Sequence, residues 1–366
     1  MVTITGKVLR ILPFKELTVT DRSDAGTDTS TSTSTSTTKK VVDLIIADES
    51  DHTRVSFWDE KAELVRRGDI KINDLLRIEN ASVSKAKAKA KTQVEISGEK
   101  QKRAYVGKYA RISKLTENKN INIAPLSHAR ANANLVKLTV LAVARPEKGQ
   151  VCIAGITEDG EWIRPQGIYE ADMDTSGTGI GIQPFKNLAV SAVYLEPWLG
   201  KHARKEDRFF VYTRGVEKEL GDMEKRAFLE RYLDASVDEV FNRGRTLGLI
   251  KPRIVHVYEK KKKRRQRQKQ TGTETEKDDS SSIRFNFKDA SGRVYRRWSC
   301  RCDSFYKTWN AMKTRHRWTY SWRMHRYLKK NEIYLAIGLT HSDYGATWLE
   351  YGAYPMIVGV HVITGR

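Results

Sequence analysis

The sequence predicts a mainly β protein built from small Greek-key barrels, and three observations support this class. Short apolar runs of strand length, many alternating with polar residues, recur along the 366 residues. Clusters of Gly, Asp, Asn and Ser separate these runs, as turns do. Three low-complexity tracts interrupt the pattern where loops are expected. The length suits two or three domains.

The first 115 residues contain the strands of one barrel. We expect these strands at 2–12, 41–47, 53–58, 74–80 and 93–96. Gly6 lies in the first of them and indicates a bend or a bulge. A short helix is expected at 60–67, between the third and fourth strands. Five strands with a helix in this place are typical of the OB fold, a five-stranded Greek-key barrel, so 1–115 is predicted to be an OB-fold nucleic-acid-binding domain.

Simple repeats occupy the two loops by which such barrels hold oligonucleotides. A Ser/Thr repeat, Thr29–Thr38, lies between the first and second strands, and KAKAKAK lies between the fourth and fifth. The lysines of the second repeat can neutralise phosphate groups; they are Lys85, Lys87, Lys89 and Lys91. Alternatively, the regularity of both repeats indicates tandem expansion of the coding sequence, and the lysines are then solvated without a selected role.

The expected third strand carries the candidate stacking ring of this barrel. Side chains alternate between the two faces of a strand, so Phe57 and Trp58 cannot both lie in the core. Val55 and Phe57 fit the inward set, which turns Arg54 and Trp58 outward, a cation and a ring on one surface. Stacking of a base on such a ring contributes about 1–3 kcal/mol and tolerates any sequence. The alternative is a core Trp58 with Phe57 outside.

Beyond the first barrel we expect a linker and two further OB-like units. Residues 116–134 are polar and rich in Ala and Asn, as linkers are. The two units are predicted at 135–258 and 283–366, and a basic and polar low-complexity insertion at 259–282 separates them. A short helical insertion is expected at 222–245, where apolar residues recur at helical spacing.

The strands of these two units follow from apolar runs and turn signals. A hairpin is expected at 151–165, with Glu158-Asp159-Gly160 as its turn. The other expected strands lie at 135–145, 188–195, 253–258, 283–287, 294–298, 333–339 and 356–363.

Positive charge is concentrated in one region of the chain. The net charge is +21, and residues 251–330 contain 25 Lys and Arg against 7 Asp and Glu. This concentration is typical of a surface that binds a polyanion. The candidate residues are Lys261, Lys262, Lys263, Arg264, Arg265, Arg296, Arg297, Trp298, Arg315, Arg317 and Trp318.

Tryptophans are interleaved with these cations. Four of the eight Trp of the chain lie in this basic region, at positions 298, 309, 318 and 322. Rings and cations in alternation suit single-stranded nucleic acid, through base stacking and cation–π contact. We expect about half of these rings to pack in the core instead, with the cations at the solvent-exposed edge of that core.

The sequence offers little support for catalysis. P-loop, HExxH and GxSxG motifs are absent, and His316, His325 and His341 fit no known spacing. The spacing of Cys300 and Cys302 is too short for the usual metal knuckle. We therefore expect no catalytic residues, metal or cofactor. The N-terminal segment does not resemble a signal peptide and no apolar run reaches membrane length, so a cytoplasmic, nucleoid-associated protein is expected.

The first 115 residues resemble the single-stranded DNA-binding OB domain of replication protein A, particularly its archaeal forms. The segments VVDLIIADES, HTRVSFWDEKAE, GDIKINDLLRIENASVS and VEISG carry the resemblance. It implies that Trp58 stacks a base and that Arg54 lies nearby. The second stacking aromatic of that family, near the hairpin of strands 4 and 5, is not evident, and Lys85–Lys91 fills this hairpin.

Residues 135–366 resemble the dual-OB domain family. The segments LTVLAVAR, CIAGITEDGEWIRP, LGLIKP and YLAIGLT carry this second resemblance. It implies surface contacts at Trp162 and Arg164.

Taken together, these features predict a non-catalytic single-stranded DNA-binding protein of the replication protein A type. Its partners would be single-stranded DNA or RNA, and replication or repair proteins. The alternatives are an RNA- or tRNA-binding OB protein, an accessory subunit of a nucleic-acid-processing complex in repair or defence, and an OB scaffold that binds protein.

Overall fold

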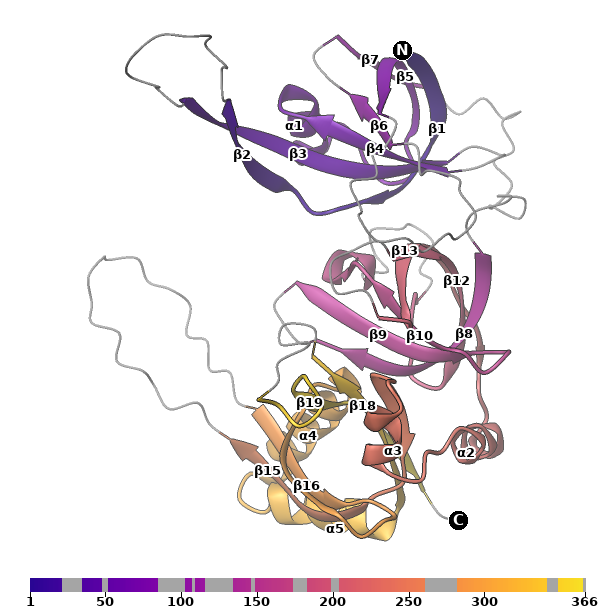
Figure 1. The fold of residues 1–366 in the computed structure, drawn as a ribbon, viewed down its shortest axis with the longest axis vertical. Coiled ribbons are helices and arrows are strands. Elements are labelled where there is room, and N and C mark those ends of the chain that lie inside the picture. Colours follow the sequence, from indigo (N-terminus) through magenta and orange to yellow (C-terminus); the bar gives the residue numbers. More distant parts are fainter. Residues whose placement is uncertain are drawn as a thin grey trace, which may run out of the picture. The chain divides into compact units, whose positions relative to one another are not determined.

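A computed structural model shows the fold of the chain (Figure 1). It describes residues 1–21, 35–47, 52–84, 103–106, 109–115, 134–145, 149–173, 183–198, 204–260, 282–340 and 348–364. The chain divides into two compact units. The described residues of the first unit end at Leu115, and those of the second begin at Asn134.

The first unit is a closed five-stranded barrel. Its strands are β1 (Val2–Ile11), β3 (Thr35–Ala47), β4 (His52–Trp58), β5 (Leu75–Ser84) and β6 (Arg103–Val106). The order around the barrel is β1-β3-β4-β6-β5, and β5 pairs again with β1. Only the β4–β6 pair among these is parallel. Helix α1 (Glu60–Arg66) lies between β4 and β5, so the expected OB topology is confirmed.

Gly6 allows the first strand to serve two neighbours. The N-terminal half of β1, Val2–Lys7, pairs with β5, and the half from Lys7 to Ile11 pairs with β3. A Cβ atom on Gly6 would lie 2.5 Å from the carbonyl oxygen of Ala47, closer than van der Waals contact permits. The bend predicted at this glycine is therefore a close backbone approach inside the barrel.

Two details of the first unit differ from expectation. Residues 35–38 of the Ser/Thr repeat are not loop but the start of β3, where they pair with β2 (Lys15–Asp21). A low-complexity Ser/Thr repeat predicts a loop, but threonine is β-branched and favours strands. The strand expected at 93–96 lies outside the described residues. The parallel closing strand is β6, and β7 (Arg111–Lys114) pairs with β5 along the edge opposite β1.

The second unit begins with another closed barrel of the same order. Its strands are β8 (Asn134–Ala144), β9 (Gln150–Thr157), β10 (Trp162–Gln166), β12 (Ala189–Pro197) and β13 (Asp207–Glu219). They pair as β8-β9-β10-β13-β12 and close through β12 onto β8, with β10–β13 parallel. The expected hairpin of β9 and β10 is confirmed. Strand β13 was not expected, and β11 (Ile168–Tyr169) and the 3-10 turn η1 (Glu170–Met173) precede β12.

The third sheet repeats the order with a broken first strand. Its strands are β14 (Leu247–Ile250), β15 (Arg253–Lys260), β16 (Ser282–Lys288), β17 (Val294–Cys300), β18 (Glu332–Leu339) and β19 (Pro355–Ile363). The order is β14-β18-β19-β17-β16-β15, with β17–β19 parallel. Lys251 and Pro252 join the two ends of this path. Because proline has no N–H to donate, it separates the half-strand on β18 from the half-strand on β16.

The predicted boundary at residue 258 is wrong. Strands β14 and β15 pair within the third sheet, so the second barrel ends at Glu219. The stretch 222–245 that follows is not one helix but two, α2 (Asp222–Arg231) and α3 (Val237–Asn242). Ser236 starts the second of these by accepting a hydrogen bond from the Glu239 N–H at 3.1 Å. Strand partners depend on contacts distant in sequence, which an apolar pattern does not specify.

Two helices that the sequence analysis did not predict lie between β17 and β18. They are α4 (Asp303–His316) and α5 (Tyr320–Lys330), and they occupy the place of the single helix of the OB fold. Their buried residues are Phe305 and Trp309 on α4, and Met324 and Leu328 on α5. Each pair has the spacing of four residues that predicts a helix face. The many cations in this segment concealed that signal.

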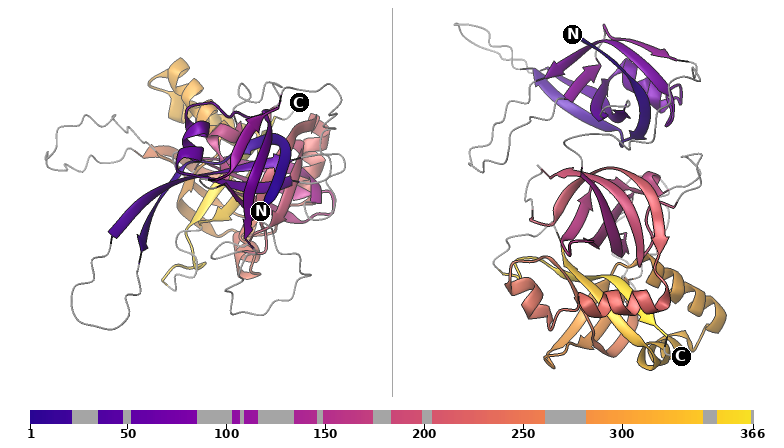
Figure 2. Two further views of the ribbon diagram at one scale, coloured as in Figure 1. Left: turned by 90° about the horizontal axis from the view of Figure 1, so that it is seen from above. Right: turned by 90° about the vertical axis from the view of Figure 1, so that its right-hand side faces the viewer.

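The second and third barrels lie side by side within the second unit (Figure 2, right). A buried apolar layer and hydrogen bonds to the backbone join them. The Arg145 N–H donates to the Arg301 carbonyl at 3.2 Å, and the Arg204 guanidinium donates to the Leu339 carbonyl at 2.9 Å. A Cβ atom on Gly359 would lie 2.2 Å from the Leu141 carbonyl oxygen, so only glycine permits this approach of β19 to β8.

Candidate nucleic-acid interface

The outer face of β4 carries the candidates of the first barrel. Val55 and Phe57 have no exposed surface and pack in the barrel core, as predicted. The alternation of the strand therefore places Arg54, Ser56 and Trp58 on the outer face. Trp58 is half-buried at the end of the strand, beside Val41 of β3. The arrangement agrees with the inward and outward sets expected from the sequence, and contact of Trp58 with a base remains a prediction.

Asp43 of β3 holds Arg54 in place on this face. The two side chains form an ion pair, and the Ser56 hydroxyl donates to the Asp43 carboxylate at 2.5 Å. Burial alone would raise the pKa of Asp43, but the Ser56 hydrogen bond and the Arg54 guanidinium hold that pKa below its usual value. The carboxylate is charged at neutral pH and offsets part of the positive charge of Arg54. The charge of Arg54 on this face is therefore partly neutralised.

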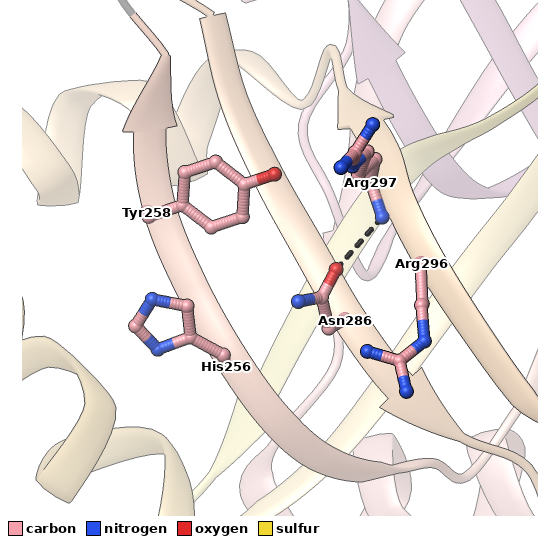
Figure 3. Close-up of a pocket in the computed structure, with 5 residues that line it drawn as sticks. All are labelled: His256, Tyr258, Asn286, Arg296 and Arg297. Carbon is pink, nitrogen blue, oxygen red and sulfur yellow. Dashed lines mark hydrogen bonds between the residues drawn. The ribbon is translucent and has the colours of Figure 1, made fainter.

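A second candidate site, with two arginines, lies on the outer face of β15, β16 and β17 in the third barrel (Figure 3). A pocket of about 310 Å³ opens there. Its lining residues are His256, Tyr258, Asn286, Arg296 and Arg297. The rings of His256 and Tyr258 stack with their centroids 5.3 Å apart and their planes 18° apart. In OB barrels the face of strands 2 and 3 is a common place for oligonucleotides.

A β-bulge turns two neighbouring arginines toward this pocket. Phe285 faces Trp298 and Phe287 faces Tyr295, so the single residue Asn286 of β16 opposes two residues of β17. Those two are Arg296 and Arg297, and both are exposed. Ordinary alternation would bury one of them; the extra residue of a bulge re-aims the side chains that follow it.

The backbone of Arg297 shows what the bulge requires. Its φ of 62° lies in the left-handed region, which is unfavourable for a residue with a side chain. The Arg297 N–H donates to the Asn286 side-chain oxygen at 2.7 Å, the bond dashed in Figure 3. The guanidinium of Arg284 in β16 also stabilises this conformation, because it donates a hydrogen bond to the Arg297 carbonyl at 3.1 Å. Strain held by surrounding bonds is frequent at functional sites.

His325 of α5 contacts one of the residues that line the pocket. Its ring lies edge-on to His256 at a centroid distance of 5.9 Å. Burial, with the nearby Lys329 and His256, lowers the pKa of His325 from its usual value. The His325 ring is therefore neutral at pH 7, and the charge beside the stacked rings comes from the arginines.

The sequence analysis missed His256, Tyr258 and Asn286. A signal was present for Asn286, which alternates with the core residues Phe285 and Phe287. Simple alternation places His256 and Tyr258 on the same face as the buried Ile254, and the register shift between Ile254 and His256, which the sequence does not reveal, separates them from it.

The bulge also corrects the assignment of Trp298. Its side chain is 7% exposed and packs among Phe241, Phe287 and Tyr295, so it is a core residue and not a binding residue. Trp309 is buried too, whereas Trp318 and Trp322 are 97% and 60% exposed. Half of the four rings in the basic region are thus in the core, as expected.

Trp162 and Arg164 are not the surface contacts that the dual-OB resemblance implied. Trp162 is 9% exposed and belongs to the apolar layer between the barrels, where the Arg245 guanidinium lies 5.9 Å from its ring centre. Arg164 is 6% exposed, and its guanidinium pairs with Asp207 at 2.7 Å across the parallel strands β10 and β13. Both residues stabilise the second unit, since a buried cation needs a partner.

The remaining candidates divide into two groups. Arg315, Arg317 and Trp318 are exposed around the turn between α4 and α5. The other candidates lie outside the described residues, as does His341; they are Lys85, Lys87, Lys89, Lys91, Lys261, Lys262, Lys263, Arg264 and Arg265. Among the described residues, no three His, Cys, Asp or Glu side chains are grouped to hold a metal ion. None of the described helices is long and apolar enough to span a membrane.

No protein-family model and no curated protein sequence matches the chain. Among solved structures, the replication factor A related protein of Methanobacterium thermoautotrophicum is similar over 31% of this chain and 78% of that chain, at 19% identity and a TM-score of 0.20. A replication protein A heterotrimer bound to single-stranded DNA is similar over 100% of this chain and 93% of that chain, at 10% identity and a TM-score of 0.27.

A murine DNA-binding protein in complex with double-stranded DNA is similar over 60% of this chain and 98% of that chain, at 11% identity and a TM-score of 0.25. Likenesses at such scores do not bear on what this chain binds. The strand order does establish the fold, because the same Greek-key arrangement occurs in all three sheets and closes into a five-stranded barrel in the first two. The chain is a mainly β protein of OB-type barrels.

Proposed function

We propose that this protein is a non-catalytic single-stranded nucleic-acid-binding protein, of the replication protein A type and with single-stranded DNA as its ligand. One observation carries the proposal: a bulge in β17 directs Arg296 and Arg297 to the same side of a barrel, beside the stacked rings of His256 and Tyr258. Guanidinium groups bind phosphate with two parallel hydrogen bonds, and aromatic rings stack bases of any sequence.

The binding mechanism follows from these two kinds of group. Arg296 and Arg297 neutralise backbone phosphates and release condensed counterions, which supplies most of the affinity. A base that leaves the backbone at this point stacks against the outer ring of the His256–Tyr258 pair. In the first barrel, Trp58 offers a second stacking surface, and Arg54 contributes a held, partly neutralised cation.

A fluorescence anisotropy titration tests the proposal. The full chain is titrated into a labelled oligo(dT) of about 30 nucleotides at several salt concentrations, with unlabelled RNA and blunt duplex as competitors. Logarithmic affinity should fall linearly with logarithmic salt, with a slope of about −0.7 for each phosphate contacted. Absence of binding at low salt, or affinity that does not respond to salt, would contradict the proposal. Stronger competition by matched RNA would replace DNA by RNA as the ligand.

The non-catalytic part of the proposal has its own test. The bound oligonucleotide is incubated with Mg²⁺, Mn²⁺, Ca²⁺ or Zn²⁺ and analysed by denaturing electrophoresis. Full recovery of intact substrate is expected with each ion. Metal-dependent shortening of the oligonucleotide would show that the protein is a nuclease.

Replacing Trp58 by Ala should weaken oligo(dT) binding by about 1 kcal/mol, because one stacked base loses its ring. The Trp58→Phe variant should recover part of the loss. Tyr109→Ala is the matched control, since Tyr109 is a 79% exposed ring of the same unit that lies outside the proposed face. Anisotropy at one fixed salt concentration compares the variants. Equal affinity of Trp58→Ala and the wild type would remove Trp58 from the binding surface.

A further inference from the structure

The pair of helices α4 and α5, here called the helical hairpin (residues 303–330), has a composition that the barrel does not need. Residues 303–330 contain eight Lys and Arg and one acidic residue, Asp303, at the start of α4. At the turn between the helices, Trp318 is 97% exposed, and Trp322 one turn later is 60% exposed. Two large apolar rings on the surface of a highly charged element indicate a contact with a ligand.

The exposed rings are not incompletely buried core residues. The core contacts of the helical hairpin are made by Phe305, Trp309, Met324 and Leu328, which are 0–3% exposed. Trp322 lies on the opposite side of α5 from this set, and the Arg326 guanidinium lies 5.4 Å from its ring centre. Trp318 follows Arg317, the C-cap residue of α4, and Arg315 and Arg317 beside it are exposed.

Both helices are anchored at the end of β15. Glu259, which follows Tyr258 of the pocket, accepts hydrogen bonds from Lys313 of α4 at 2.9 and 3.0 Å and from Tyr320 of α5 at 3.1 Å. The Trp309 ring meets the Tyr320 ring edge-on at 5.5 Å. Both helices are thus anchored to the strand that carries His256 and Tyr258. Helices that are anchored before binding lose little backbone conformational entropy on contact with a ligand.

The helical hairpin and the pocket face lie next to each other. Helix α5 packs on β15 in the third barrel (Figure 1). The His325 and His256 rings there are 5.9 Å apart. The two surfaces are suited to different ligands. The pocket face suits a flexible strand, whereas a protruding ring flanked by guanidinium groups suits a flat apolar surface with phosphates on both sides.

We propose that the helical hairpin binds the end of a duplex, so that the preferred ligand is a junction between single-stranded and double-stranded nucleic acid. The proposal rests on the proposed function, because the single strand leaving the duplex occupies the β15–β17 face. Trp318 covers the last base pair, whose outer face is exposed only at a duplex end. Cations around the ring contact the phosphates of both strands of the duplex, as apolar wedges and flanking cations do in other nucleic-acid-binding proteins.

Anisotropy titrations on three labelled ligands test this inference with the full chain: a single-stranded oligo(dT), a blunt DNA hairpin, and the same hairpin with a 3′ or 5′ oligo(dT) tail. The wild type should bind a tailed hairpin at least about fivefold more tightly than the oligo(dT), the lower end of what one stacked ring contributes. Trp318→Ala should remove this preference and leave oligo(dT) affinity within about twofold. Trp348→Ala, a 67% exposed ring outside the helical hairpin, should leave the preference unchanged.

A direct readout of stacking accompanies the titrations. A 2-aminopurine in the last base pair of the tailed hairpin should change its fluorescence on binding to the wild type and not on binding to Trp318→Ala. Loss of oligo(dT) and tailed-hairpin affinity by equal factors in Trp318→Ala would overturn the junction assignment and leave the proposed function intact. Absence of oligo(dT) binding by the wild type would instead overturn the proposed function.

An anionic membrane surface is the competing occupant of such a patch. Vesicles of phosphatidylserine and phosphatidylcholine provide the comparison. If they bind the wild type with a Trp318-dependent blue shift of fluorescence, and the tailed hairpin shows no preference, the helical hairpin is a lipid-binding element and the inference is overturned.

Discussion

Replacing both Arg296 and Arg297 by Ala is expected to weaken oligo(dT) binding at least about 30-fold, equivalent to about 2 kcal/mol. Each guanidinium makes charge-assisted hydrogen bonds to phosphate, and such bonds contribute about 1.5–3 kcal/mol. The same change should make the salt slope about 1.4 less steep, because two phosphate contacts are lost at about 0.7 each. Anisotropy at four salt concentrations measures both quantities.

Three further variants separate charge, geometry and fold in this experiment. A double Lys variant keeps the salt slope but loses affinity, because an ammonium group cannot make the bidentate contact. Arg243→Ala removes an exposed cation of α3 and should leave binding unchanged. Arg297→Gly should unfold at an equal or higher urea concentration than the wild type while binding weakly, because glycine relieves the φ of 62°. Wild-type affinity in the double Ala variant would contradict the proposed site.

Acid is expected to destabilise the second unit through His361. This side chain of β19 is 4% exposed, at the joint with β8, and burial lowers its pKa to about 4. In the unfolded chain the pKa of histidine is about 6.5. The contribution of His361 to the free energy of unfolding is therefore fully present above pH 6.5. It is lost as the pH falls through the folded pKa, because the unfolded chain binds the proton first. The loss attributable to His361 at pH 4.5 should be about 2–3 kcal/mol.

Urea unfolding at pH 7.5 and pH 4.5 tests this expectation. The wild type and His361→Gln are compared by tryptophan fluorescence, since glutamine keeps a hydrogen-bond donor but does not titrate. The carboxylates of the protein contribute equally to both acid transitions and cancel in the comparison. The drop in unfolding free energy should be about 2–3 kcal/mol smaller in the variant. Identical drops in the two proteins would show that His361 is not the source of acid sensitivity.

Local patterns in the sequence were sufficient for most strands and for the faces of β4. Val55 and Phe57 alternate with Arg54 and Trp58, and an alternation of this kind needs no knowledge of the partner strand. The hairpin of β9 and β10 was predictable for the same reason, because its turn sits between two runs that pair with each other. These are properties of neighbouring residues, and the structure confirms them.

Other features depend on contacts that are distant along the chain. The sequence predicted 135–258 as one unit, yet Leu247–Ile250 pairs with β18, more than eighty residues later. The dual-OB resemblance implied surface contacts at Trp162 and Arg164, but the apolar layer shared with the third barrel buries Trp162, and the parallel strand β13 supplies Asp207 to Arg164. No feature of a single strand records which strand or barrel will lie against it.

The sequence by itself determined that this protein is mainly β, that it contains OB-type barrels, and that its positive charge gathers in residues 251–330. Periodicity and composition are properties of neighbouring residues, so they can be read from the sequence without a structure. Only the tertiary structure decided which basic and aromatic residues are displayed together. Arg296 and Arg297 share one face with His256 and Tyr258 because a bulge in β17 adds one residue against β16, and Trp298 turns into the core for the same reason. A register shift is a relation between two strands, and the site exists only where they pair.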